Sequence, residues 1–254
     1  MKSLKESIAE AMDYTNRDTS IVPFLPCILQ DFWTLGTPPD VVIALVRKHC
    51  IAETGSVILD LGCGMGAVSV KLAEALKCHC YGIDGIPEFI EKAKVKAIEY
   101  GVEALCRFEA GDVRDKIKAL NRFDVIILGA IGPVFGNYHE TLTTLSKHLT
   151  KEGIIIINDA YIDDTSAYRH PSILPHSELL MQTNEAGMKL IDEVTIGQDN
   201  SVEEFANIQK RCNELILRHP DKTALFENYI QSQADENDAL ENEMIGSIMV
   251  FKWN

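Results

Sequence analysis

Three glycines follow a strand-like run at 57–60 and precede an apolar helical pattern. They are Gly62, Gly64 and Gly66, and Asp60 stands at the base of their turn. This order predicts a tight turn at the carboxyl edge of a parallel sheet, where ligands bind in open α/β folds. Glycine lets a ligand touch the backbone, and the N–H groups at a helix start attract anionic groups. Because Asp60 repels a pyrophosphate but suits an ammonium group, a cofactor with a carboxylate and an amine at one end fits best.

The same loop also satisfies the loose form of the dinucleotide-binding fingerprint. Gly62, Gly64 and Ala67 match the pattern Gly-x-Gly-x-x-Gly/Ala. A nicotinamide-dependent oxidoreductase therefore stays open as an alternative. The simplest alternative is a tight strand–helix turn that binds no ligand. The nicotinamide alternative gives no role to Asp60 or Asp112.

Short β-rich runs alternate with helical patterns from Ser56 onward. Seven runs are predicted strands: 57–60, 80–84, 105–110, 123–129, 154–158, 190–196 and 244–253. Strands separated by helices in this way are typical of a parallel sheet that is covered on both faces. The sequence predicts an α/β fold with a Rossmann-like, seven-stranded, mostly parallel sheet.

The chain is expected to form one domain, residues 1–254, in four parts. These are an N-terminal helical cap at 1–52, a core at 53–198, inserted helices at 199–243 and a final strand at 244–254. The cap contains several prolines and aromatic residues, and we expect it to pack across the mouth of the sheet. A turn is predicted at 151–153, and Asp221 is predicted to cap a helix that runs toward Leu240.

Composition limits the function classes. A net charge of −14 argues against a nucleic-acid partner, because phosphate binding depends on Lys and Arg. No apolar run approaches the roughly 20 residues that cross a bilayer, so no membrane partner is expected, and residues 1–7 lack the features of a secretory signal. Seven scattered cysteines favour reduced thiols in a cytoplasmic protein. A small-molecule or protein substrate is left, and a monomer and a homodimer both stay open.

Residues 60–66, Asp-Leu-Gly-Cys-Gly-Met-Gly, resemble the first motif of the class I S-adenosylmethionine (SAM)-dependent methyltransferases. Further segments follow the family pattern in order: Tyr81-Gly82-Ile83-Asp84, Ala110-Gly111-Asp112-Val113, Phe123-Asp124-Val125-Ile126-Ile127-Leu128-Gly129 and Leu149-Thr150-Lys151-Glu152-Gly153-Ile154. Each lies at an end of a predicted strand. The resemblance covers residues 55–196 and the last strand.

The resemblance implies that SAM binds across these strand ends, with S-adenosylhomocysteine (SAH) as the product. Asp84 then accepts from both ribose hydroxyls, and Asp112 accepts from the adenine amino group. Val113 and Ile86 are implied to lie on the two faces of the adenine ring. The implied cofactor site comprises Asp60, Gly62, Cys63, Gly64, Gly66, Asp84, Gly85, Ile86, Gly111, Asp112, Val113, Leu128 and Gly129.

The implied reaction moves the methyl group from the SAM sulfonium to an N, O, C or S nucleophile of a small molecule by in-line displacement. Because this methyl group is already activated, the enzyme chiefly orients the nucleophile and excludes water. A general base is needed only for a nucleophile with a proton of high pKa, so the catalytic residue stays unknown. The substrate-side candidates are Asp159, Tyr161, His139 and Trp33.

Missing motifs narrow the branch of the family. The sequence lacks both the amino-methylation signature of DNA-modifying enzymes and the Pro-Cys nucleophile of cytosine C5 enzymes. Asp159 has no acidic partner after 123–129 for Mg²⁺, and Cys78 and Cys80 point away from His79 on a strand, so no metal site is expected. What remains resembles the small-molecule branch, which includes quinone, sarcosine and phosphoethanolamine methyltransferases. A non-catalytic SAM-binding protein stays a further alternative.

Overall fold

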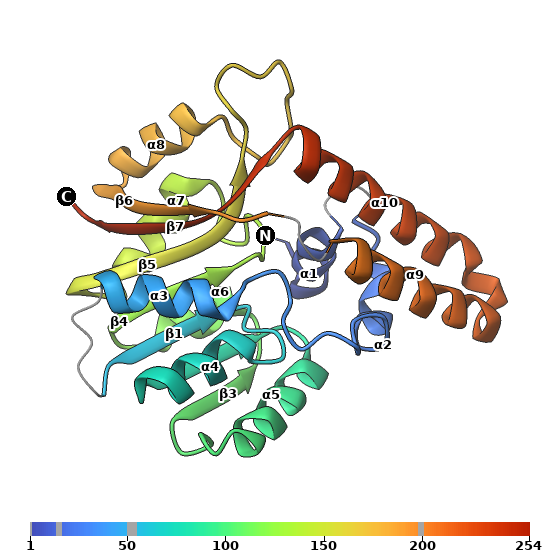
Figure 1. The fold of residues 1–254 in the computed structure, drawn as a ribbon, viewed down its shortest axis with the longest axis horizontal. Helices are drawn as coiled ribbons and strands as arrows, with labels where there is room; N and C mark the ends of the chain where they lie inside the picture. The colour runs from blue at the N-terminus through green and yellow to red at the C-terminus, as the bar shows by residue number, and fades with distance from the viewer. Residues whose placement is uncertain (1, 14–16, 50–54, 198–200) are drawn as a thin grey trace.

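Seven strands form one sheet in the order β3-β2-β1-β4-β5-β7-β6 in the computed structural model, which describes residues 2–13, 17–49, 55–197 and 201–254 (Figure 1). The strands are β1 (Val57–Leu61), β2 (His79–Asp84), β3 (Cys106–Ala110), β4 (Phe123–Gly129), β5 (Leu149–Tyr161), β6 (Met188–Thr195) and β7 (Ile245–Trp253). Strands β1 to β5 pair in parallel, and β7 runs antiparallel to both of its neighbours. The predicted mostly parallel sheet is confirmed.

Helices cover both faces of this sheet (Figure 1). One face carries α3 (Pro39–His49), α4 (Ala67–Leu76) and α5 (Pro87–Glu99), and the other carries α6 (Val113–Lys116), the 3₁₀ turn η2 (Ile117–Ala119), α7 (Tyr138–Ser146) and α8 (His176–Glu185). The predicted α/β layering is therefore confirmed as well. The described helices include none that is long and apolar enough to span a membrane.

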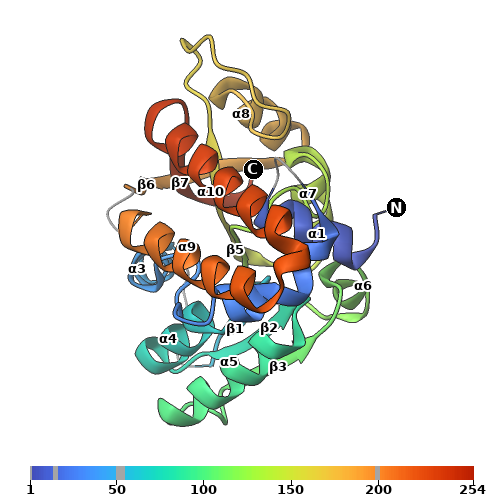
Figure 2. The same ribbon diagram turned by 90° about the vertical axis from the view of Figure 1, so that its right-hand side faces the viewer.

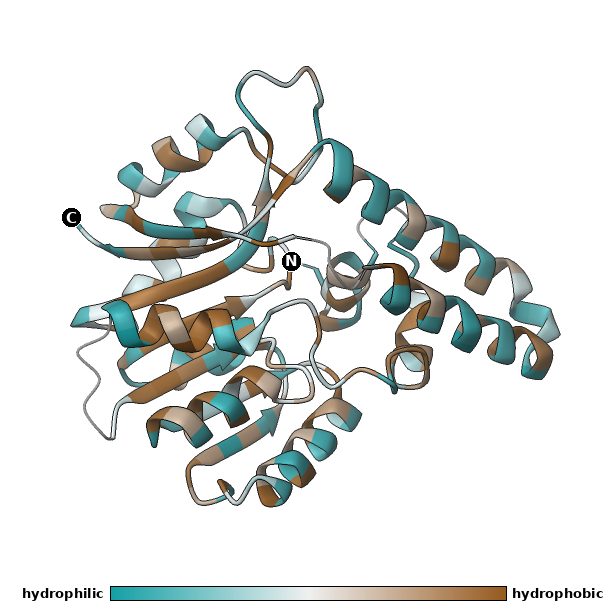
Figure 3. Ribbon diagram, in the orientation of Figure 1, coloured by the Kyte–Doolittle hydropathy of each residue, from teal (hydrophilic) through white to brown (hydrophobic). Residues whose placement is uncertain are grey.

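Strand β5 contributes to the apolar clusters on both faces of the sheet. Its isoleucines at 154 to 157 are all buried. Because side chains alternate along a strand, Ile154 and Ile156 join the apolar cluster under α3 to α5, whereas Ile155 and Ile157 join the cluster under α6 to α8. In Figure 3 the central strands are accordingly brown along most of their length, and the outer helices alternate between brown and teal.

A third layer of helices lies over the carboxyl ends of the strands. It is built from α1 (Leu4–Met12), the 3₁₀ turn η1 (Thr19–Phe24), α2 (Leu25–Ile28), α9 (Ser201–Arg218), the 3₁₀ turn η3 (Pro220–Lys222) and α10 (Thr223–Asn242). Figure 2 shows α9 and α10 side by side. Buried residues such as Ile21, Leu215 and Phe226 form one apolar cluster with Met65, Ile86 and Phe89 of the core. This cluster fastens the third layer to the loops that follow β1 and β2.

Two local predictions are wrong. The segment 151–153 is part of β5, which begins at Leu149 and pairs with β4 across a register shift. Asp221 does not cap a helix, because it lies inside η3 and its carboxylate pairs with Lys222, while α10 begins at Thr223. The predicted boundaries at 52–53 and 198–199 lie outside the described residues.

Asn158 joins the N-terminal segment to the sheet. Its side-chain amide is buried in the second half of β5 and donates to the Gly36 carbonyl at 3.2 Å and to Thr37 Oγ1 at 2.9 Å. Gly129 of β4 lies opposite Asn158 in the sheet, and a Cβ at Gly129 would lie 2.9 Å from the same Thr37 oxygen. The approach to α3 is therefore held tightly against the ends of β4 and β5.

We expect Asn158→Ala to lower the free energy of unfolding by about 1 to 3 kcal/mol, because it leaves the buried Thr37 hydroxyl and the Gly36 carbonyl without their donor. Asn121→Ala, in the exposed segment between η2 and β4, serves as the matched control and should change stability by less than about 0.5 kcal/mol. Urea unfolding of both variants measures the difference. Equal stability of the two would contradict the anchoring role of Asn158.

Candidate functional site: the carboxyl ends of β1, β2 and β3

The glycine loop between β1 and α4 adopts a conformation that favours glycine. Gly62, Gly64 and Gly66 have φ angles of 72°, 53° and 78°, in the left-handed region. The N–H groups of Gly62 and Cys63 donate to the Ile83 carbonyl at 2.8 and 3.1 Å. These bonds hold the loop against β2, while the last residue of the loop leads directly into α4.

Asp84 ties this loop to the next one. Its carboxylate accepts from the N–H of Gly64 at 2.9 Å through Oδ2 and from the N–H of Ile86 at 2.8 Å through Oδ1. Burial raises the pKa of Asp84, although both backbone hydrogen bonds act in the opposite direction. Each oxygen keeps a further acceptor position, so Asp84 can still receive hydrogen bonds from a ligand.

Asp60 lies beneath the glycine loop rather than at its surface. Its side chain is buried and accepts from the Ser69 hydroxyl of α4 at 2.6 Å. Burial raises the pKa of Asp60 to about 6, and the negative charge of Asp84 adds to the rise. Ser69 was not among the predicted site residues, and its only signal in the sequence is a polar side chain in the first turn after the loop. The predicted contact of Asp60 with a cofactor amine stays a prediction.

Asp112 follows β3 and caps α6. Its two oxygens accept from the backbone N–H and the guanidinium of Arg114, at distances between 2.5 and 3.1 Å. This pairing lowers the pKa of Asp112. Both oxygens are thus already used by one arginine, which the sequence analysis did not single out. An adenine amino group can bind the Asp112 carboxylate only if it takes over one of the guanidinium contacts.

The other residues of the predicted cofactor site lie around these carboxylates. Gly111 donates its N–H to the Asp84 carbonyl at 2.8 Å, so the end of β3 is held against β2. Ile86 and Val113 are both buried but belong to different apolar clusters, and the predicted stacking of adenine between them stays a prediction. Leu128 is buried near the end of β4, where Gly129 closes the strand.

Apolar side chains cover the loops. A Cβ at Gly62 would lie 2.2 Å from Ile131 Cγ2, so Ile131 packs directly on this glycine. A Cβ at Gly85 would lie 2.9 Å from Ile8 Cδ1 and 3.1 Å from Leu4 Cδ1, so α1 covers the end of β2. A ligand on this loop therefore has to displace Ile131 and the first turns of α1 from their present positions.

The substrate-side candidates do not come together as one group. The Asp159 carboxylate accepts from the Tyr138 hydroxyl at 3.0 Å, and burial raises its pKa to about 6. Tyr161 donates its hydroxyl to Glu193 at 2.6 Å and stacks on the His176 ring with centroids 4.4 Å apart. Both candidates lie on the sheet face that α7 and α8 cover.

His139 and Trp33 come from other elements, α7 and the segment between α2 and α3. His139 is half-buried in the first turn of α7. Trp33 donates its indole N–H to the Met65 carbonyl at 3.0 Å, and its ring packs 4.9 Å from Tyr100. The Lys96 ammonium lies 5.2 Å from the Trp33 ring centroid. These contacts make Trp33 a support of the glycine loop on the side of α4 and α5.

No group of His, Cys, Asp and Glu side chains among the described residues is placed to hold a metal ion. Cys78 and Cys80 lie with their sulfur atoms 3.8 Å apart, as expected for alternate residues near a strand start.

Comparison with known proteins identifies the family. A family model described as a methyltransferase domain matches residues 52–235. The chain belongs to the class I SAM-dependent methyltransferases. A SAM-dependent methyltransferase from Geobacter sulfurreducens, solved in complex with SAH, aligns with a TM-score of 0.77 and 20% identity, over 91% of this chain and 98% of that one. The likeness to that structure shows the shared fold, and SAM is the cofactor of the family.

Curated methyltransferases match over shorter stretches. A malonyl-[acyl-carrier protein] O-methyltransferase from Bacillus cereus is 27% identical over 156 residues, which is 60% of this chain and 52% of that protein. An uncharacterized RNA methyltransferase from Parasynechococcus marenigrum is 34% identical over 89 residues, which is 34% of this chain and 19% of that protein. The chain thus spans about half the length, or less, of these relatives. Their names cover different acceptor classes.

We expect Asp60→Asn to change how stability depends on pH. The pKa of Asp60 rises from 3.8 to about 6 on folding. Its contribution to the free energy of unfolding of wild type is therefore largest below pH 4, where the carboxyl is protonated, and is lost as pH rises through 6. Asparagine stays neutral. As pH rises from 4 to 7, the free energy of unfolding of the variant should therefore increase by up to about 3 kcal/mol relative to that of wild type, as measured by urea unfolding.

The matched control is Asp115→Asn, an exposed carboxylate on α6, which should follow the wild-type curve. Parallel curves for Asp60→Asn and wild type across this pH range would show that the Asp60 carboxylate is not desolvated.

Proposed function

We propose that this chain transfers a methyl group from SAM to a nucleophilic N, O, C or S atom of a small molecule. The observation that carries the proposal is the set of three carboxylates, Asp60, Asp84 and Asp112, at the ends of three neighbouring strands around one glycine loop. An amine, a ribose and an adenine amino group are chemically suited to three such acceptors in this order. The nicotinamide alternative still gives no role to Asp60 or Asp112.

The residues present fit SAM. The positive-φ glycines leave the loop backbone without side chains, so a ligand can reach it once Ile131 moves, and Asp84 keeps free acceptor positions on both oxygens. When bound, SAM supplies a methyl group on a sulfonium, whose C–S bonding pair stays with sulfur as the methyl passes to the acceptor. The chain's own part is to orient the acceptor in line and to exclude water.

Asp159 is the best-placed candidate for a proton acceptor. Tyr138 and the backbone N–H of Ala160 hold its carboxylate at 3.0 and 2.8 Å, and β5 brings it beside the end of β4. Because burial raises the pKa of Asp159 to about 6, it is mostly ionised at pH 7 and able to take a proton from an acceptor. A nucleophile without a proton needs no such group.

A small-molecule acceptor is favoured over RNA by charge. The chain has a net charge of −14, whereas RNA binding depends on neutralising phosphates with Lys and Arg. A cytoplasmic location is part of the same proposal. It is supported by the six described cysteines, which are all free and of which Cys63, Cys78, Cys80 and Cys212 are buried.

Thermal unfolding with SAH, SAM and NADH in parallel tests the proposal. A ligand that binds only the folded state raises stability by about 2.7 kcal/mol at a concentration 100 times its Kd. We expect SAH and SAM to raise the melting temperature and NADH to leave it unchanged. Asp84→Ala should weaken SAH binding by about 100-fold, because charge-assisted hydrogen bonds to the ribose are lost.

Asp115→Asn provides the control, since this carboxylate on α6 is exposed and pairs with Lys118. Stabilisation by NADH and not by SAH would refute the proposal. Unchanged SAH affinity in Asp84→Ala would refute the assignment of the ribose to Asp84.

A further inference from the structure

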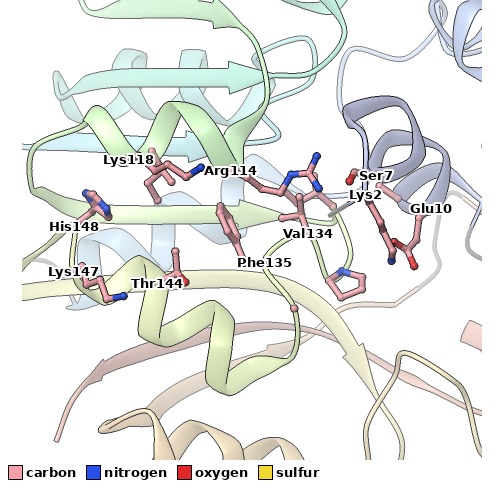
Figure 4. A pocket seen from close by; sticks show the side chains of 15 residues that line it. Lys2, Ser7, Glu10, Arg114, Lys118, Val134, Phe135, Thr144, Lys147 and His148 are labelled. Carbon is pink, nitrogen blue, oxygen red and sulfur yellow. The ribbon is translucent and has the colours of Figure 1, made fainter.

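A cavity of about 520 Å³ lies between α1, α6, the loop after β4 and α7 (Figure 4). Its volume is within the range of roughly 300 to 1,000 Å³ that small-molecule sites occupy. The loop after β4 contributes the apolar residues Val134 and Phe135, and η2 contributes Ile117. The cavity can therefore take an apolar body of small-molecule size.

Positive side chains surround this apolar surface. Lys2, Arg114, Lys118 and Lys147 line the cavity, and Glu10 is the acidic residue among its lining residues. The lining thus has a local excess of positive charge although the chain has a net charge of −14, and this favours an anionic ligand.

The positive charge is least compensated at one end of the cavity. Lys2 pairs with Glu10, and Arg114 pairs with Asp112. In Figure 4, Lys118 and Lys147 both lie away from Lys2, Lys118 above strand β4 and Lys147 below it at the end of α7. Lys118 has an exposed pair with Asp115, which contributes little, and Lys147 has no ion pair with any described residue. An anionic group at this end of the cavity would be attracted by both lysines, which line it from two sides.

Ile131 connects the cavity to the cofactor loop. It lines the cavity, and the same side chain packs directly on Gly62. A ligand whose charged group is near Lys118 and Lys147 and whose body lies on Val134 and Phe135 thus extends toward the glycine loop.

We propose that this cavity is the acceptor site and that the acceptor is an amphipathic anion. Its carboxylate, phosphate or sulfate group binds Lys118 and Lys147, and its apolar body lies along Ile117, Val134 and Phe135. The atom to be methylated is at the other end, beside Ile131. This inference rests on the proposed function, because it names the acceptor class for the same methyl transfer.

Isothermal titration with two probes of equal chain length, decanoate and decylamine, tests the sign of the charge that the cavity accepts. We expect decanoate to bind wild type and decylamine to bind at least about tenfold more weakly. Decanoate should bind the double variant Lys118→Gln/Lys147→Gln about tenfold more weakly than wild type, because the charge-assisted contacts to its carboxylate are lost. Lys118→Glu/Lys147→Glu should reverse the preference between the probes.

The matched control is Lys94→Gln/Lys151→Gln, which removes two exposed lysines that do not line the cavity and should leave decanoate binding unchanged. Val134→Trp, which fills the apolar part, should abolish binding of decanoate while SAH still raises the melting temperature. Decanoate should still bind the protein saturated with SAH, since the two ligands occupy neighbouring sites.

Three results would overturn the inference: no binding of decanoate to wild type, equal affinity in wild type and Lys118→Gln/Lys147→Gln, or displacement of decanoate by SAH, which would assign the cavity to the cofactor. Failure of the proposed function looks different. In that case SAH fails to stabilise wild type, whereas decanoate still binds and still depends on the two lysines.

Discussion

The site depends on one carboxylate that accepts hydrogen bonds from two loops. Asp84 at the end of β2 receives the N–H of Gly64 from the loop after β1 and the N–H of Ile86 from the start of α5. These bonds fix how the glycine loop enters α4 and how α5 begins. The helical third layer then packs on the same loops through Met65 and Ile86. A loss of the Asp84 carboxylate would therefore disturb the glycine loop and its cover together.

Several carboxylates are buried near the carboxyl ends of the strands. Desolvation raises the pKa values of Asp60, Asp84 and Asp159, so keeping these carboxylates ionised costs free energy in the protein without a ligand. SAM carries two positive groups, an ammonium and a sulfonium. Binding such a cation offsets part of that cost for Asp60 and Asp84, the two buried acids at the glycine loop. The lysines at the far end of the neighbouring cavity are suited to an acceptor of the opposite charge.

Much of this arrangement follows from the sequence, because strand ends and glycine positions are local features. The parallel strands, the positive-φ loop and the place of Asp84 could all be predicted from spacing. Contacts between distant segments could not. Ile131 on Gly62 and Trp33 on the Met65 carbonyl join residues that no periodicity connects. The pairing of Asp112 with Arg114 is local in the sequence. The family motif assigns the Asp112 carboxylate to the ligand, however, and therefore does not predict this ion pair.

The most direct test of this account is a crystal structure of the protein with SAH bound. The account predicts that the ribose hydroxyls lie within hydrogen-bond distance of the Asp84 carboxylate. It also predicts that Ile131 has moved off Gly62 and that the adenine amino group has replaced a guanidinium contact of Arg114 on Asp112. SAH bound away from the ends of β1 to β3, or bound there with its ribose out of reach of Asp84, would contradict the central claim.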